Sequence, residues 1–145
     1  MKVDLVRFYR CPATGTKLEL KAAEKRGEKI IEGELVNTNE LIYPVNNGIP
    51  DFTWPKELKE VDQETRKKYD YLAKNYDKFA SIPFQTFKCD EDEVREKMID
   101  RLYIEPADKV LEIGCGDGRG SLHILERLSA KGDLFLQELS TVFLE

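Results

Sequence analysis

One stretch of the sequence, residues 110–118, restricts the fold more than any other. It reads Val-Leu-Glu-Ile-Gly-Cys-Gly-Asp-Gly, an apolar run that ends abruptly in glycines at alternate positions, Gly114, Gly116 and Gly118. A helical pattern follows from about residue 121 to 128. A buried strand, a tight turn and a helix N-terminus in this order let backbone amides approach a ligand closely. Glycine suits such a turn because a side chain would hinder either the positive backbone angles or the ligand.

Two acidic residues accompany the apolar runs of this region. Glu112 stands two positions before the first glycine, and Glu138 follows a second apolar run, residues 134–137. An acid at the end of the second strand is where such folds hold ribose hydroxyls. The glycine spacing is GxGxG, which differs from the GxGxxG of a dinucleotide fingerprint. The pattern therefore predicts the first βαβ unit of a doubly wound α/β sheet.

These residues resemble the first two motifs of class I S-adenosylmethionine-dependent methyltransferases. The sequence KVLEIGCGDGRGS, residues 109–121, is similar to their glycine-rich motif, and residues 138–140, Glu-Leu-Ser, are similar to the acid-x-Ser that closes their second strand. The resemblance implies a Rossmann-like domain over residues 108–145 and S-adenosylmethionine as its cofactor. The turn would approach the methionine and ribose portion, Glu112 would help to hold the amino end, and Glu138 would accept from the ribose hydroxyls. The implied cofactor-binding residues of this motif are Glu112, Gly114, Cys115, Gly116, Asp117, Gly118 and Glu138.

Residues 1–53 are expected to form a small β-rich module, because short strand-like segments alternate with turn residues. Cys11-Pro-x-Thr-Gly15 and the stretch Tyr43-Pro-Val-Asn-Asn-Gly-Ile-Pro50 resemble the small zinc-ribbon-like proteins that activate tRNA and protein methyltransferases. Related modules also occur ahead of methyltransferase domains, including some that act on ribosomal RNA. The expected core residues are Leu5, Leu18, Leu20, Ile31, Leu35, Tyr43, Val45 and Ile49.

The module departs from the zinc-ribbon pattern at the metal ligands. A structural zinc site takes four sulfur or nitrogen ligands in a tetrahedron. Thr14 stands where the second cysteine of the first pair would be, and the stretch before Tyr43 offers Asn37, Asn39 and Glu40 but no cysteine. One cysteine cannot close such a site, so we predict no metal.

Residues 54–107 are expected to be a helical linker and cap. Apolar residues at three- and four-residue steps over 57–80 predict one amphipathic helix or two short ones. Residues 81–89 are expected to form a loop at the substrate entrance, and Asp90 is expected to cap a helix that extends to about Tyr103. Residues 69–77 are similar to the Tyr-Asp-rich helix that caps the cofactor pocket in many small-molecule and quinone-type methyltransferases. That resemblance makes Tyr76 a candidate lid residue, with simple packing of its ring as the alternative.

Composition and charge exclude several other classes of protein. The net charge of −5 gives no general attraction to nucleic acid, although residues 1–30 hold eight Lys and Arg against four Asp and Glu. Nothing in the sequence indicates a membrane span or a signal sequence, and three scattered cysteines fit a reducing compartment, so we expect a cytoplasmic protein. The single histidine, His123, gives a hydrolytic Cys-His or Ser-His site little to build on.

The Rossmann-like part is short for a class I methyltransferase, which would continue with five further strands. Three explanations are open: a fragment of a longer methyltransferase, which we favour; half of a split enzyme; or a chain that has lost catalysis. The expected function is methyl transfer from S-adenosylmethionine to an unidentified acceptor, either a small molecule or an RNA or translation factor. The alternative is a non-catalytic activator or partner of a separate methyltransferase. A two-stranded sheet leaves open edges, so an oligomer or a partner chain that covers it is also expected.

Overall fold

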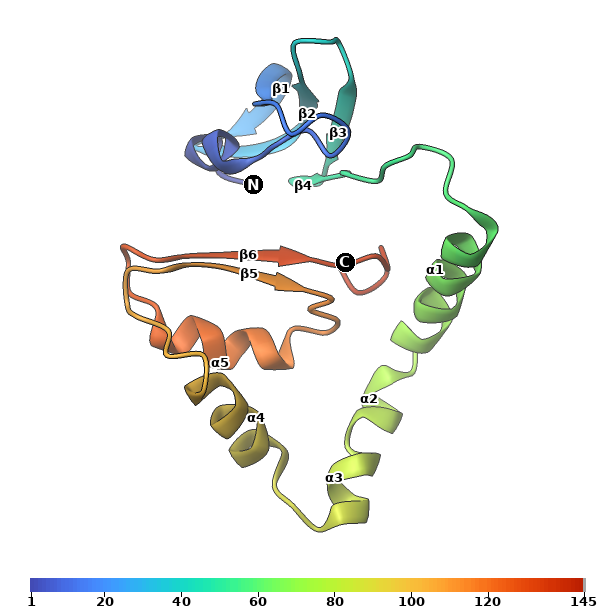
Figure 1. Ribbon diagram of the computed structural model, residues 1–145, viewed down its shortest axis with the longest axis vertical. Helices are drawn as coiled ribbons and strands as arrows, with labels where there is room; N and C mark the ends of the chain where they lie inside the picture. The colour runs from blue at the N-terminus through green and yellow to red at the C-terminus, as the bar shows by residue number, and fades with distance from the viewer. Residues whose placement is uncertain (145) are drawn as a thin grey trace. The chain divides into compact units, whose positions relative to one another are not determined.

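The computed structural model describes residues 1–144, without the side chains of Ala22 and Asp77, and has an α+β fold that combines helices with two sheets, as predicted (Figure 1). The chain divides into two compact units at the junction between Lys59 and Glu60. The helices that follow this junction belong to the same unit as the glycine-rich turn. The sequence-based boundaries at residues 53 and 107 stay predictions.

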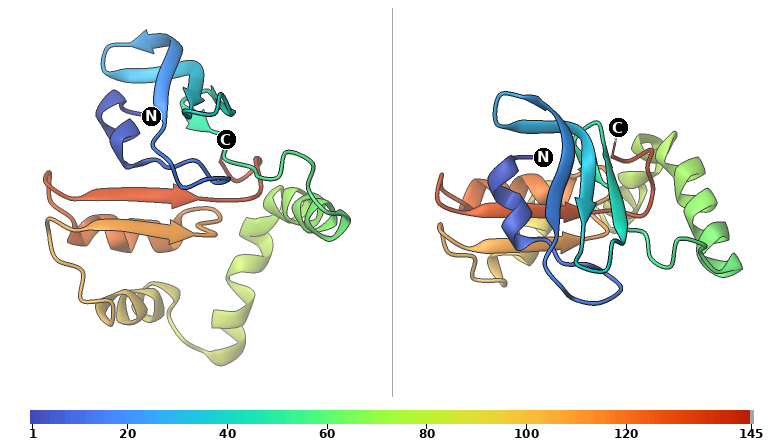
Figure 2. Two further views of the ribbon diagram at one scale, coloured as in Figure 1. Left: turned by 45° about the horizontal axis from the view of Figure 1, so that its top comes forward. Right: turned by 90° about the horizontal axis from the view of Figure 1, so that it is seen from above.

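The first unit is a four-stranded antiparallel sheet with the order β1-β2-β3-β4, preceded by one turn-rich 3₁₀ segment at Val3–Phe8 (Figure 2). A tight hairpin turn at Gly27 joins the first two strands, and its φ of +62° suits glycine. The strands are β1 (Glu19–Arg26), β2 (Lys29–Val36), β3 (Ile42–Asn46) and β4 (Ile49–Pro50).

The core of the first unit differs from the predicted one, because Leu5, Leu20, Ile31 and Ile49 are only partly buried. Ile30 is fully buried, whereas the predicted Ile31 is only half-buried. Ile30 and Leu35 both point into the core although they lie five residues apart on β2, where strict alternation would place them on opposite faces. A shift in the β1–β2 register between Glu24 and Lys25 marks the irregularity that reverses the alternation. The buried core residues are Cys11, Leu18, Ile30, Leu35, Tyr43 and Val45.

The second unit begins with four helices. They are α1 (Glu60–Ala73), α2 (Tyr76–Ala80), α3 (Ile82–Phe87) and α4 (Glu91–Asp100). The loop expected over residues 81–89 is therefore wrong, because α3 occupies its centre. Pro83 lies in the first turn of α3, where a missing N–H breaks no helical hydrogen bond. The cap of α4 is confirmed, since the Asp90 side chain accepts a hydrogen bond from the Glu93 N–H at 2.9 Å.

The order of the predicted βαβ unit is confirmed at the end of the described chain, but the expectation of a buried first strand is wrong, because Leu111 and Ile113 are 58% and 73% exposed on a sheet of only two strands. Strand β5 (Lys109–Ile113), helix α5 (Arg119–Arg127) and strand β6 (Asp133–Gln137) follow one another, and the two strands pair in parallel. Ile113 lies opposite Gln137, so the carboxyl ends of both strands meet at one edge. Across residues 1–144, no helix has both the length and the apolar character to cross a membrane.

Candidate functional site

The turn between β5 and α5 has the backbone that its glycines predict. Gly114, Gly116 and Gly118 have φ values of +73°, +54° and +79°, all in the left-handed region that other residues adopt only with strain. Gly118 is the residue that precedes the first turn of α5. The chain thus reverses from strand to helix within a few residues, at the carboxyl edge of the sheet.

The amides of this turn donate within the chain. The N–H groups of Gly114 and Cys115 donate to the Gln137 carbonyl at 2.7 and 3.2 Å, and that of Gly116 donates to Glu138 Oε2 at 2.9 Å. What the turn offers a ligand is room, because a Cβ built on Gly114 or Gly116 would meet no atom within 4 Å. Side-chain atoms at these positions would fill a space that the glycines keep open.

Glu138 lies at the tip of β6 with its carboxylate held by three backbone donors. Oε2 accepts from the Gly116 N–H, and Oε1 accepts from the N–H groups of Leu139 and Ser140 at 2.8 and 3.0 Å. A carboxylate has about four lone-pair sites, so about one is left for a hydroxyl donor. The sequence pointed to Glu138 as an acceptor, but its link to Gly116 across the turn carried no sequence signal.

The other acidic residues of the motif serve the start of α5. Glu112 Oε2 accepts from the Ser121 hydroxyl at 2.6 Å, which ties β5 to the first turn of the helix. Asp117 pairs with Arg119, Oδ2 to Nε at 2.8 Å. Glu112 and Asp117 therefore lie beside the turn, and the structure gives each a partner from the chain itself.

Cys115 is buried inside the turn. Burial raises the pKa of its thiol, and the nearby carboxylates of Glu138 and Glu112 raise it further. The thiol therefore stays protonated at neutral pH, which makes it a poor nucleophile. A packing role for this small side chain, as the sequence indicated, agrees with its surroundings.

Two contacts connect helices α1 and α2 to the segment that follows β6. The Ser140 hydroxyl donates to Asp70 Oδ1 on α1 at 2.7 Å, and the rings of Tyr76 and Phe143 meet edge-to-face with centroids 5.2 Å apart. The structure thus brings Tyr76 to the segment that follows Glu138. Asp70 was missed by sequence reasoning, since its only signal was its place in the Tyr-Asp-rich stretch.

In the first unit, Cys11 occupies a buried polar cluster. Its Sγ lies 3.1 Å from Tyr43 Oη, and Asn37 Nδ2 donates to the same Sγ at 3.2 Å. Burial raises the pKa of the thiol, but hydrogen bonds from Thr14, Tyr43 and two backbone amides outweigh it and lower the pKa to about 7. Burial, and after it the contact with Cys11, raise the pKa of Tyr43 to about 12, so the phenol stays protonated at neutral pH. No group of three or more His, Cys, Asp and Glu side chains within residues 1–144 is placed to hold a metal ion.

The lowered pKa of Cys11 predicts a pH-dependent stability. Its ordinary value is 9.0, so folding favours the thiolate, and the added stability is complete above pH 9 and lost as the pH falls through 7. Urea unfolding between pH 6.5 and 9 should show a free energy of unfolding that rises more with pH in the wild type than in Cys11→Ser. Parallel profiles for the two proteins would contradict this assignment.

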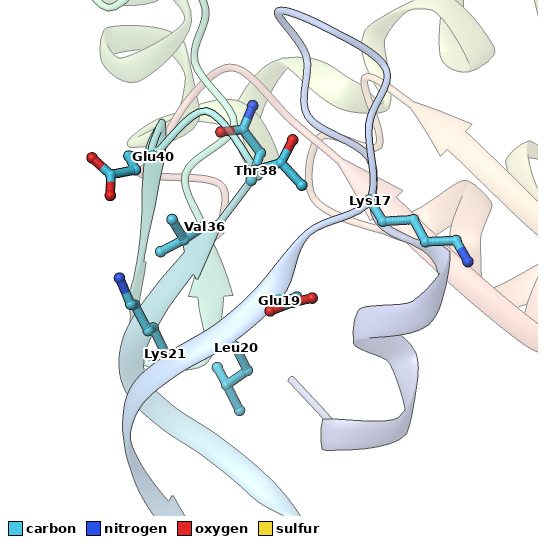
Figure 3. Close-up of a pocket in the computed structure, with 8 residues that line it drawn as sticks. Lys17, Glu19, Leu20, Lys21, Val36, Thr38 and Glu40 are labelled. Atoms are coloured by element: carbon cyan, nitrogen blue, oxygen red, sulfur yellow. The ribbon is translucent and has the colours of Figure 1, made fainter.

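Two shallow surface hollows lie in the first unit, and neither is lined by residues of the glycine turn. Figure 3 shows the first, where the start of β1 lies beside the end of β2; its labelled lining combines Leu20 and Val36 with Thr38 and the charged side chains Lys17, Glu19, Lys21 and Glu40. Its lining mixes both signs of charge, and its buried polar residue, Asn37, is hydrogen-bonded within the chain to Cys11, Thr14 and the Leu41 N–H. The candidate site therefore stays at the turn and the tip of β6.

No protein-family model matches this sequence, and no curated protein matches it. Part of the chain is similar to a chain from the solved complex between the Haloferax volcanii Trm112 methyltransferase activator and the putative methyltransferase. The two are 38% identical, and the match covers 38% of this chain and 95% of that chain, with a TM-score of 0.36. At that TM-score the structural overlap carries no argument, so function rests on the residues of the site.

Proposed function

We propose that the second unit binds S-adenosylmethionine and serves methyl transfer to an acceptor that the residues do not identify. The observation that carries the proposal is the pairing of Gly116 with Glu138. The space at the Gly116 Cβ position is open, and beside it Glu138 has a carboxylate fixed by three N–H donors. An immobilised acceptor next to a side-chain-free turn suits a ligand with adjacent hydroxyls, such as a ribose.

The chemical groups that the site residues offer suit this cofactor. Glu138 would accept from ribose hydroxyls, and the surfaces of Gly114 and Gly116 would lie against the adjoining part of the ligand. When bound, the cofactor supplies a methyl group on a sulfonium, which is a good electrophile. The work of the protein is then to hold and orient the donor for in-line attack by the acceptor. Glu112 supports the turn through Ser121, and the Tyr76 ring on α2 packs against Phe143 in the segment that follows Glu138.

Calorimetric titration of the chain with S-adenosylmethionine and S-adenosylhomocysteine tests the proposal. We expect saturable binding, and we expect Glu138→Ala to weaken it by about tenfold or more, since the ligand hydroxyls and three backbone N–H groups lose their acceptor. Glu105→Ala, an exposed glutamate in the same unit, is the matched control and should bind as the wild type does. A folded wild-type protein that shows no binding would refute the cofactor assignment.

A second candidate function is a non-catalytic activator or partner of a separate methyltransferase. The first unit favours it, because it has a buried core of its own and carries the residues that resemble methyltransferase activators. If the chain is an activator, affinity purification should recover a methyltransferase bound to it tightly and in stoichiometric amount. Cofactor binding should then be seen only when that partner is present.

A further inference from the structure

A chain of hydrogen bonds connects helix α1 to the glycine turn. It begins at Asp70, whose Oδ1 accepts from the Ser140 hydroxyl at 2.7 Å. The Ser140 N–H donates to Glu138 Oε1 at 3.0 Å, and Glu138 Oε2 accepts from the Gly116 N–H at 2.9 Å. Four residues from three parts of the sequence are thus joined in one continuous network.

Ser140 is the central member of this network, and it is fully buried. Its hydroxyl also accepts from the Phe143 N–H at 3.4 Å, which shapes the segment whose ring meets Tyr76. A buried hydroxyl that donates one hydrogen bond and accepts another keeps a fixed orientation only while both of its partners are present. Asp70 is the partner that comes from outside this segment.

From this network we infer that Asp70 is a positioning residue for the Glu138 carboxylate. It fixes the Ser140 hydroxyl, and thereby holds the Ser140 N–H where it donates to Glu138. The consequence for cofactor affinity rests on the proposed function, whereas the positioning itself does not. Helix α1 is then a part of the site that must be docked for Glu138 to be held in place, although it contributes no atom to the turn.

Two substitutions at Asp70 can distinguish its hydrogen bond to Ser140 from an effect of its negative charge. Asp70 and Glu138 are both acidic, so removal of the Asp70 charge alone would relieve a repulsion and would not weaken the position of Glu138. Asp70→Asn keeps an acceptor oxygen for Ser140 and removes the charge. Asp70→Leu has a similar size and removes the acceptor. The two variants therefore distinguish the hydrogen bond from the charge.

The test measures amide hydrogen exchange by NMR on the full chain, at Gly116, Leu139 and Ser140. We expect Asp70→Leu to speed exchange at Ser140 and Gly116 by about fivefold or more, as the loss of one buried hydrogen bond implies. In Asp70→Asn, the exchange rates of these amides should stay within about twofold of the wild-type rates. Asp62→Leu, at an exposed aspartate on the same helix, is the control and should leave these amides unchanged. Unchanged rates in Asp70→Leu, or equal effects of Leu and Asn, would overturn the positioning role.

Titration with S-adenosylmethionine provides the second readout. Asp70→Leu should raise Kd about fivefold and Asp70→Asn should not. If the exchange rates change as expected while even the wild type binds no cofactor, the positioning stands and the proposed function fails. If Asp70→Leu does not fold, Ser140→Ala replaces it and must speed exchange at Gly116. Where Asp70→Leu does fold, its effect on exchange and that of Ser140→Ala must be less than additive in the double variant, because both substitutions remove the same hydrogen bond.

Discussion

Replacement of Gly116 by valine should abolish binding of S-adenosylmethionine. The glycine has a φ of +54°, and a Cβ at this position would enter space in which the chain has no atom within 4 Å. That space is where the proposed cofactor lies, so a branched side chain would collide with the ligand and not with the protein. Overpacking of this kind amounts to about 3 kcal/mol, and we therefore expect affinity to fall by about 100-fold or more.

Gly27 provides a matched control for this substitution. It also has a left-handed φ, +62°, and a Cβ built on it also meets nothing within 4 Å, but it lies in the β1–β2 hairpin of the other unit. Gly27→Val should carry similar backbone strain and leave cofactor binding intact. Calorimetry on both variants, with circular dichroism to verify folding, separates strain from occupation of the ligand space. Equal affinity of Gly116→Val and wild type would remove the turn from the site.

The strand–turn–helix arrangement around Gly116 was predictable because the signal is local. An apolar run, glycines at alternate positions and a helical period are all read within about twenty residues of sequence. The structure has β5, the turn and α5 in that order, with the expected left-handed backbone. The parallel partner β6 followed from the same pattern, since a strand after such a helix returns to the same sheet.

The positions that sequence reasoning missed depend on tertiary context. Ile30 replaced Ile31 in the core because an irregular β1–β2 register reverses the alternation of β2, and nothing in the residues of β2 announces it. Helix α3 was overlooked because Pro83 signals a break, although proline is compatible with the first turn of a helix.

The hydrogen-bond network of the site could not be predicted from the sequence. Asp70 and Ser140 are 70 positions apart in the sequence and meet only because α1 docks beside the tip of β6. Glu138 could be identified as an acceptor by its place after a strand, but the three backbone donors that hold it follow from the turn geometry. Sequence reasoning thus found the residues nearest the proposed ligand and missed those that fix them.

The first unit should lose most of its stability on replacement of Leu35 by alanine. Leu35 is fully buried on β2, opposite Leu20 on β1 and Tyr43 on β3. Truncation of a buried leucine lowers the free energy of unfolding by about 2–5 kcal/mol, and we expect about 3 kcal/mol here. A unit of this size has a total stability of only a few kcal/mol. Loss of NMR amide dispersion for residues 1–59 would report the unfolding.

Leu111→Ala is the control for this experiment, because Leu111 on β5 is 58% exposed and its truncation should change stability by no more than about 0.5 kcal/mol. The decisive readout is the titration of Leu35→Ala with S-adenosylmethionine. Binding that survives unfolding of residues 1–59 would assign the cofactor site to the second unit alone and leave the first unit free for an activator or partner role. Binding that is lost with the first unit would show that the turn at Gly116 and the carboxylate of Glu138 do not suffice, and that cofactor binding depends on a folded β-rich unit.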